Sequence, residues 1–173
     1  KVYSQYPIYG ECPPSVKKTD TLPADVAVSV FSEKSVLSLA PKSVVLGVGC
    51  RKGTLQSTIE AVFERFLKES GLHREAVYAA ASIDLKKDES GLIDFCRSNG
   101  WEFKTCSADE LRNVPGEFTK SSFVNQITGV DNVCERSAVF VSGGTLYAKK
   151  FAADGVTMAA AGKPVRLDWN LNR

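Results

Sequence analysis

The 173-residue sequence has one histidine and no pair of cysteines at the C-x-x-C spacing, and these absences narrow the chemistry open to it. A zinc site needs Cys or His ligands paired at short spacing, and a Ser-His-Asp triad needs a histidine beside its nucleophile. His73 follows an expected helix, and we expect it on the surface, at the edge of the sheet opposite the loops described below. The sequence therefore predicts no protein-bound metal and no such triad.

A charge excess and a long apolar run are also missing. The net charge is only +2, which lacks the basic excess of a nucleic-acid-binding domain. No apolar run approaches the roughly 20 residues that span a bilayer, and the first residues have no apolar stretch of a signal peptide. We expect neither a nucleic acid nor a membrane as a partner.

The cysteines are odd in number, whereas a disulfide framework is typical of smaller secreted chains with an even count. They are Cys12, Cys50, Cys96, Cys106 and Cys134. We expect reduced thiols and a cytoplasmic location.

Residues 1–42 differ in composition from the rest, because they carry five of the seven prolines and little helical periodicity. Short strands are expected near Val2–Tyr6 and Asp25–Phe31. Because the sequence opens on an expected strand without an initiator Met, we expect a missing N-terminal part. We divide the chain into 1–42 as the end of a linker region, 43–161 as an α/β domain, and 162–173 as a tail.

From residue 43 onward, expected strands and helices alternate. The strands are Ser43–Val48, Val77–Ile83, Trp101–Thr105, Thr145–Lys150 and Val156–Ala161, and the helices are Thr54–Ser70, Ser90–Ser98, Ser107–Arg112, Ser121–Ile127 and Asn132–Val141. This alternation predicts a three-layer α/β/α fold, with a mixed, mostly parallel sheet and an edge hairpin turning at Asp154-Gly155. The uninterrupted apolar run Ser43–Val48 is expected to be an inner strand.

Helix ends carry local signals. Ser57 with Glu60, and Ser107 with Glu110, have the spacing of capping boxes. Asp131 is the expected N-cap of the helix at 132–141. Gly71 suits a left-handed helix end.

Three loops are expected at the carboxyl ends of the parallel strands, where ligands bind in such sheets: Gly49–Gly53, Asp84–Glu89 and Cys106–Glu110. The first loop follows Gly47 but is neither a G-x-G-x-x-G fingerprint, because its third glycine comes one residue late, nor a Walker loop. Backbone N–H groups at a helix start, with Arg51 and Lys52, favour an anion. The alternative, that the glycines only permit a tight turn, stays open.

Candidate acid–base groups are carboxylates, because no histidine is available. They are Asp84, Asp88, Glu89, Asp109, Glu110 and Glu135, most of which we expect to be caps or solvated charges. Cys50 is interpreted as a packing residue, because no base is positioned to ionise its thiol.

Taken together, these motifs resemble the C-terminal domain of the cobalt-precorrin-5A hydrolase family of anaerobic cobalamin biosynthesis. The matching stretches are GVGCRKGT at 47–54, SIDLKKDE at 82–89, CSADEL at 106–111, GVDNVCERSA at 129–138, and Lys150 with GVT at 155–157. They keep the family's order over about Ser43–Ala161. Residues 1–42 are similar to the end of the family's linker region. Lys52 and Lys149 depart from the usual arginine and proline. A related stand-alone protein of the aerobic pathway shares this domain.

The resemblance implies hydrolysis of a δ-lactone in cobalt-precorrin-5A, giving cobalt-precorrin-5B and acetaldehyde. No cofactor is expected, because the cobalt belongs to the substrate. The implied partners are the cobalt corrinoid and an N-terminal domain of the same enzyme, and a homodimer stays open. A non-catalytic tetrapyrrole-binding module is the alternative.

The implied site combines loop residues with two carboxylates. Backbone N–H groups of Gly49–Gly53 would stabilise an oxyanion, and Asp84 or Glu135 would hold the water; Glu135 is alternatively a buried structural hydrogen-bond partner. The implied substrate-binding residues are Gly49, Cys50, Arg51, Lys52, Gly53, Thr54, Lys86 and Lys150.

Overall fold

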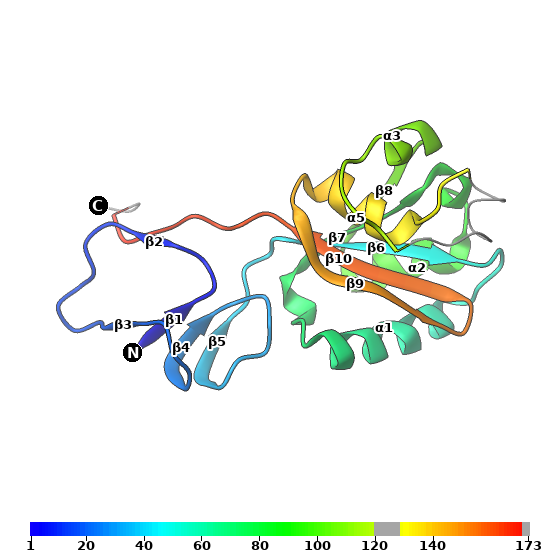
Figure 1. The fold of residues 1–173 in the computed structure, drawn as a ribbon. Helices are drawn as coiled ribbons and strands as arrows, with labels where there is room; N and C mark the ends of the chain where they lie inside the picture. The colour runs from blue at the N-terminus through cyan, green and yellow to red at the C-terminus, as the bar shows by residue number, and fades with distance from the viewer. Residues whose placement is uncertain (120–128, 171–173) are drawn as a thin grey trace.

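A computed structural model of the chain describes residues 1–119 and 129–170, and Figure 1 shows its fold. The strands are β1 (Val2–Ser4), β2 (Ile8–Tyr9), β3 (Lys18–Thr19), β4 (Ala24–Val28), β5 (Ser35–Leu39), β6 (Val44–Cys50), β7 (Val77–Ile83), β8 (Glu102–Cys106), β9 (Thr145–Ala153), β10 (Val156–Gly162) and β11 (Leu167–Asp168). The helices are α1 (Gln56–Ser70), α2 (Ser90–Asn99), α3 (Ala108–Arg112) and α5 (Val133–Ser142), with 3-10 turns η1 (Arg74–Ala76) and η2 (Asp84–Lys86). The helix expected at Ser121–Ile127 lies outside the described residues.

The larger sheet has the order β8-β7-β6-β10-β9. β8, β7 and β6 pair in parallel, and the β9–β10 hairpin joins β6 antiparallel. β6 lies in the middle because Val44, Val45 and Leu46 offer only apolar side chains, and all three are fully buried. The mixed, mostly parallel sheet, its inner strand and its edge hairpin are confirmed.

Helices cover both faces of this sheet, so the predicted three layers are confirmed. α1 and α2 pack on one face, and α5 packs across β6, β7 and β10 on the other; Figure 1 shows α1 below the sheet and α3 above it. α1 buries the stripe Ile59, Val62, Phe63 and Phe66. No helix in residues 1–119 or 129–170 combines the length and apolarity needed to cross a membrane.

Residues 1–39 form a small lobe with a separate parallel sheet, in the order β3-β1-β4-β5. The tail returns to this lobe, because β11 pairs with β2 (Figure 1). The lobe is packed against the α/β domain: Tyr6 is buried in the main core, and the carbonyl of Val30 accepts the N–H of His73. β5 was not expected, because its Ser and apolar residues are mostly exposed and follow no burial alternation.

Two of the expected helix caps are wrong. The N-cap of α1 is Leu55, with no side-chain hydrogen bond, so Ser57 lies inside the helix and does not cap it. At α5 the N-cap is Asn132, whose side chain accepts the N–H of Glu135, while Asp131 pairs with Arg136. The capping box at Ser107–Glu110 and the left-handed helix end at Gly71 are confirmed.

Candidate ligand-binding site

A cavity of about 670 Å³ opens where the carboxyl end of β6 meets the edge hairpin and the start of α5. This volume lies within the roughly 300–1,000 Å³ of small-molecule sites. Its walls are Gly49, Cys50, Arg51, Lys52, Ile83, Lys86, Asn132, Val133, Cys134, Lys150, Ala152, Ala153, Asp154, Gly155, Val156 and Thr157.

The cavity brings together most of the residues that the sequence implied for substrate binding. Gly49, Cys50, Arg51 and Lys52 come from the end of β6, Lys86 comes from η2, and Lys150 comes from β9. Gly53 and Thr54 follow in the same loop but do not line the cavity. The parallel register of β6 and β7 brings the first two groups together, and the antiparallel hairpin adds the third.

The rim of the cavity is cationic. Lys86 forms an ion pair with Glu89 at 3.3 Å, and Asp154, the acidic residue of the cavity wall, forms one with Arg65 outside the wall at 2.9 Å. Within the described ranges, the side chains of Arg51, Lys52 and Lys150 form no ion pair. This side of the molecule can therefore attract an anionic ligand, while Ile83, Val133 and Val156 supply apolar wall.

The N–H groups of the first loop, expected as free donors, are largely engaged within the chain. The N–H of Arg51 donates to the carbonyl of Gly155, and the N–H of Thr54 donates to the carbonyl of Arg51. The N–H of Gly53 donates to the Glu89 carboxylate at 2.9 Å. α1 starts only at Gln56, so its dipole end lies beyond this loop. An anion at the cavity must therefore rely on side-chain donors rather than on these three N–H groups.

Glu89 is a site residue that the sequence analysis named only among the candidate carboxylates. It is the N-cap residue of α2, yet its side chain does not cap that helix and reaches the preceding loop instead. Burial raises the pKa of Glu89, but the Gly53 N–H and the Lys86 and Lys52 ammonium groups outweigh it, so the pKa is lowered overall. A Glu at a helix start is a local signal for capping, and only the packing of the two loops shows its actual partner.

The two candidate acid–base carboxylates lie in different surroundings. Asp84 follows β7 as the first residue of η2, is exposed and does not line the cavity; its carboxylate makes no hydrogen bond or ion pair in the part of the chain that the structure describes. Glu135 is fully buried and does not line the cavity. Its oxygens accept the N–H and hydroxyl of Thr119, the Asn132 amide and the Lys150 N–H. This geometry favours the structural alternative for Glu135.

Cys50 lines the cavity, half-buried. Burial raises the pKa of its thiol, and the neighbouring Lys86 only partly offsets this, so a thiolate is disfavoured. The geometry fits a neutral packing thiol.

The glycines of the first motif serve packing and turning. A Cβ at Gly47 would overlap the carbonyl oxygen of Cys134, so this glycine lets α5 lie directly on β6. Gly53 has φ +74° with open space around it, which suits a turn. The close approach at Gly47 was not anticipated, because its partner lies 87 residues further along the chain.

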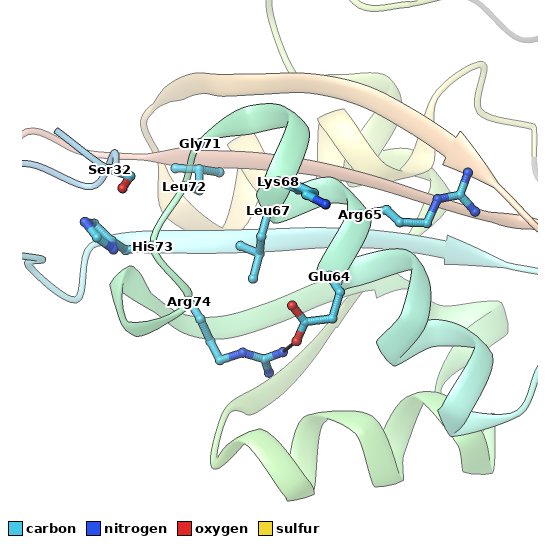
Figure 2. A pocket seen from close by; sticks show the side chains of 9 residues that line it. All are labelled: Ser32, Glu64, Arg65, Leu67, Lys68, Gly71, Leu72, His73 and Arg74. Carbon is cyan, nitrogen blue, oxygen red and sulfur yellow. Dashed lines mark hydrogen bonds and ion pairs between the residues drawn. The ribbon is translucent and has the colours of Figure 1, made fainter. Parts of the chain in front are cut away.

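A second cavity, of about 660 Å³, lies at the other end of the sheet and holds none of the implied site residues (Figure 2). Of its three Lys and Arg residues, Arg74 pairs with Glu60 and Glu64 of α1, and Arg65 pairs with Asp154. His73 lines this cavity, at the end of the sheet away from the first loop as expected; it is half-buried, and its Nε2 is buried and unpaired among the described residues. Across residues 1–119 and 129–170, no group of three or more His, Cys, Asp or Glu is arranged to hold a metal ion.

Comparisons with known proteins agree on one family. The family model described as "Cobalamin synthesis G C-terminus" matches residues 44–161. The cobalt-precorrin-5A hydrolase of Priestia megaterium is 37% identical over 122 residues, covering 70% of this chain and 32% of that protein. The enzyme of the same name from Salmonella typhimurium is 35% identical over 120 residues, covering 69% and 34%. The chain thus spans about a third of the length of these relatives.

The crystal structure of CobE, a protein from the cobalamin (vitamin B12) biosynthetic pathway, has a TM-score of 0.65 and 28% identity to this chain. The match covers 70% of this chain and 91% of CobE. The matched family model covers the α/β domain, from the start of β6 to the end of the hairpin. The sheet order, the cavity loops and these matches together show that the chain belongs to the cobalamin synthesis G C-terminal family.

Proposed function

We propose that this chain is the C-terminal part of a cobalt-precorrin-5A hydrolase and that its cavity binds the carboxylate-bearing rim of the cobalt corrinoid. The observation that carries the proposal is the cluster of Arg51, Lys52, Lys86 and Lys150 around a partly apolar cavity. A corrinoid intermediate presents an apolar macrocycle edge and several carboxylates, which suits both kinds of wall. Guanidinium and ammonium groups bind carboxylates through charge-assisted hydrogen bonds.

In the proposed reaction, water attacks the carbonyl carbon of the δ-lactone, and the C–O bond of the ring breaks. The hydroxyl group released from the lactone then loses its proton as the C–C bond between its carbon and the macrocycle breaks. The two-carbon fragment leaves as acetaldehyde, the bonding electrons stay on the macrocycle, and cobalt-precorrin-5B is formed. The developing oxyanion would be stabilised by the side chain of Arg51 or Lys86, because the N–H groups of Arg51, Gly53 and Thr54 are engaged within the chain. Asp84 does not line the cavity, but it directly follows Ile83 of the cavity wall and its carboxylate is unpaired among the described residues, so it is the candidate to accept the proton of the water. The cobalt is that of the substrate, and no resident cofactor enters the proposal.

The rest of the native protein belongs in the proposal as well, because the curated relatives are about three times as long as this chain. Sites for large ligands are often formed between domains, which exclude water and fix orientation. We expect residues 1–173 to bind the corrinoid but to release acetaldehyde orders of magnitude more slowly than the whole native gene product. A cytoplasmic location is part of the proposal; it is supported by the five free cysteines.

The test is an absorbance titration of residues 1–173 with cobalt-precorrin-5A, followed by an acetaldehyde assay on the same samples. Arg51→Glu should weaken binding, whereas Lys68→Glu, the same charge change on an exposed residue of α1, should not. Equal affinity of wild type and Arg51→Glu, with both folded, would place the site elsewhere. Comparable acetaldehyde rates for 1–173 and the native gene product would show that the whole active site lies in this domain.

A tetrapyrrole-binding accessory module is the second candidate. The match to CobE favours it, because the matched 70% of this chain already covers 91% of CobE, which leaves little of CobE outside the shared fold. In this case, the corrinoid would bind to 1–173 with the same dependence on Arg51. The native gene product would then release no acetaldehyde from cobalt-precorrin-5A.

A further inference from the structure

We propose that Glu135 is a positioning residue: its buried carboxylate fixes the backbone of Lys150 so that the Lys150 side chain stays at the wall of the cavity. This inference rests on the proposed function, in which Lys150 contacts a carboxylate of the ligand. In this proposal Glu135 does not contact the substrate or the water; it acts only by holding Lys150 in place.

The first observation is an irregularity in the edge hairpin. Met158 of β10 pairs with Phe151 of β9, and Ala160 pairs with Ala148, so three steps along β9 match two along β10. An extra residue in one strand interrupts the regular ladder and re-aims the side chains around it. Lys150 lies in this interruption, within the outermost strand of the sheet. Its orientation is therefore not set by ladder hydrogen bonds alone.

The second observation is the hydrogen bond that secures this point. The N–H of Lys150 donates to Oε1 of Glu135 at 2.7 Å. Glu135 belongs to the first turn of α5, which packs beside β9. A hydrogen bond to a charged acceptor is shorter and stronger than one between neutral groups. The bulged strand is thus tied to the helix at the residue whose side chain lines the cavity.

The third observation is that Glu135 has no spare capacity for a water or a substrate. Oε1 also accepts the hydroxyl of Thr119 at 2.9 Å. Oε2 accepts the N–H of Thr119 and the amide of Asn132, both at 2.8 Å. With the side chain fully buried and two donors on each oxygen, the carboxylate serves as a fixed anchor. A buried carboxylate with this many partners is costly to disturb, which suits a positioning role.

The consequence for the ligand lies in the cation arrangement. Lys86 is held by Glu89 through its side chain, at 3.3 Å, whereas Lys150 is held through its backbone. The ammonium group of Lys150 therefore has no anchoring ion pair among the described residues, and it stays available to an incoming carboxylate. Anchoring only the backbone keeps the charge free while limiting the conformations that must be ordered on binding.

The test is a double-mutant cycle on cobalt-precorrin-5A affinity with Glu135→Gln and Lys150→Met. Gln has one acceptor oxygen, and its amide nitrogen cannot accept the bonds that the second carboxylate oxygen receives. Each single variant should weaken binding about tenfold, and the double variant should be no weaker than Lys150→Met alone. Fully additive losses would show that Glu135 does not act through Lys150, and unchanged affinity of a folded Glu135→Gln protein would also overturn the proposal.

The matched control is Thr119→Val, which removes a hydroxyl donor from the same oxygen of Glu135 but leaves the Lys150 N–H in place. It should lower the urea midpoint without changing affinity. If it weakens binding as much as Glu135→Gln does, Glu135 supports the general fold and has no specific link to Lys150.

A readout without ligand separates this inference from the proposed function. The Lys150 amide of the wild-type protein should exchange its hydrogen slowly, and in Glu135→Gln it should exchange faster than its neighbours in β9. Rapid exchange in the wild type would overturn the inference even if Glu135→Gln fails to fold. Slow exchange together with no corrinoid binding would retain the anchoring contact but reject the proposed function on which its role depends.

Discussion

Replacing Glu89 tests how the loops around the cavity are held together. Its carboxylate accepts the Gly53 N–H at 2.9 Å and pairs with Lys86 at 3.3 Å, so it joins the loop after β6 to the turn after β7. The side chains of Glu89 and Lys86 are only 13% and 17% exposed, so solvent screens this pair less than a surface pair. Glu89→Ala should destabilise the domain and loosen both loops.

The size of the effect follows from these contacts. A hydrogen bond to a charged group contributes about 1.5–3 kcal/mol, and removing one partner of a fully buried ion pair costs about 3–5 kcal/mol. Because the pair is partly solvated, we expect about 3 kcal/mol in total for Glu89→Ala. Glu89→Gln keeps an acceptor for the Gly53 N–H and loses the ion pair, so about 1 kcal/mol is expected. With a urea m-value of about 2 kcal/mol/M, the midpoints should fall by about 1.5 M and 0.5 M.

The pH dependence of this difference has a defined sign. The folded-state pKa of Glu89 is lowered, so its contribution is fully present above the unfolded value of about 4.3 and is lost as pH falls through the folded pKa. The gap in unfolding free energy between wild type and Glu89→Gln should be largest at pH 7 and should shrink below about pH 4. Urea unfolding followed by near-UV circular dichroism measures it, with Asp88→Asn, an exposed neighbour, as the control. An equal gap at pH 7 and pH 3, or equal midpoints for Glu89→Ala and Asp88→Asn, would refute the reasoning.

Three further outcomes are expected. Arg51→Glu should cost about 1.5–3 kcal/mol of corrinoid binding free energy in absorbance titrations, and Lys52→Glu should cost less, because only Arg51 has a planar guanidinium that can bind a carboxylate through two hydrogen bonds. Equal losses would contradict this. Cys50→Ser should retain most acetaldehyde release in the native gene product, because burial disfavours the thiolate; complete loss in a folded protein would make Cys50 a nucleophile. Gly47→Ala should lower stability by about 3 kcal/mol in urea unfolding, because its Cβ meets the Cys134 backbone; an unchanged midpoint would show that α5 can move away freely.

Local sequence signals predicted most elements of the α/β domain. The apolar run at Ser43–Val48 can only be stable when both faces are covered, so it identified the inner strand without knowledge of its neighbours. Gly71 marked a helix end, because glycine adopts the left-handed conformation without strain, and its φ is positive. Asp154-Gly155 likewise marked the hairpin turn. These features depend on a few consecutive residues, and the sequence contains all of them.

Which of two neighbouring polar residues caps a helix could be decided only from the position of the folded backbone. Asp131 and Asn132 are both residue types that cap helices well. The position of α5 against the sheet decides that the Asn132 side chain, and not that of Asp131, accepts the N–H of Glu135. Ser57 and Glu60 had the right spacing for a capping box, but α1 begins before them. Spacing alone therefore could not set these helix starts.

The sequence by itself determined the order of the strands and helices described in the α/β domain, the buried central strand and the candidate cations near strand ends. Tertiary structure alone decided the partners of the buried carboxylates: Glu89 meets the Gly53 N–H 36 residues away, and Glu135 meets the N–H of Lys150, 15 residues away. The physical reason is that apolar burial depends on patterns within one segment, whereas a buried charge is stable only where donors from several segments converge on it. That convergence exists only after the sheet, α5 and the edge hairpin have packed together.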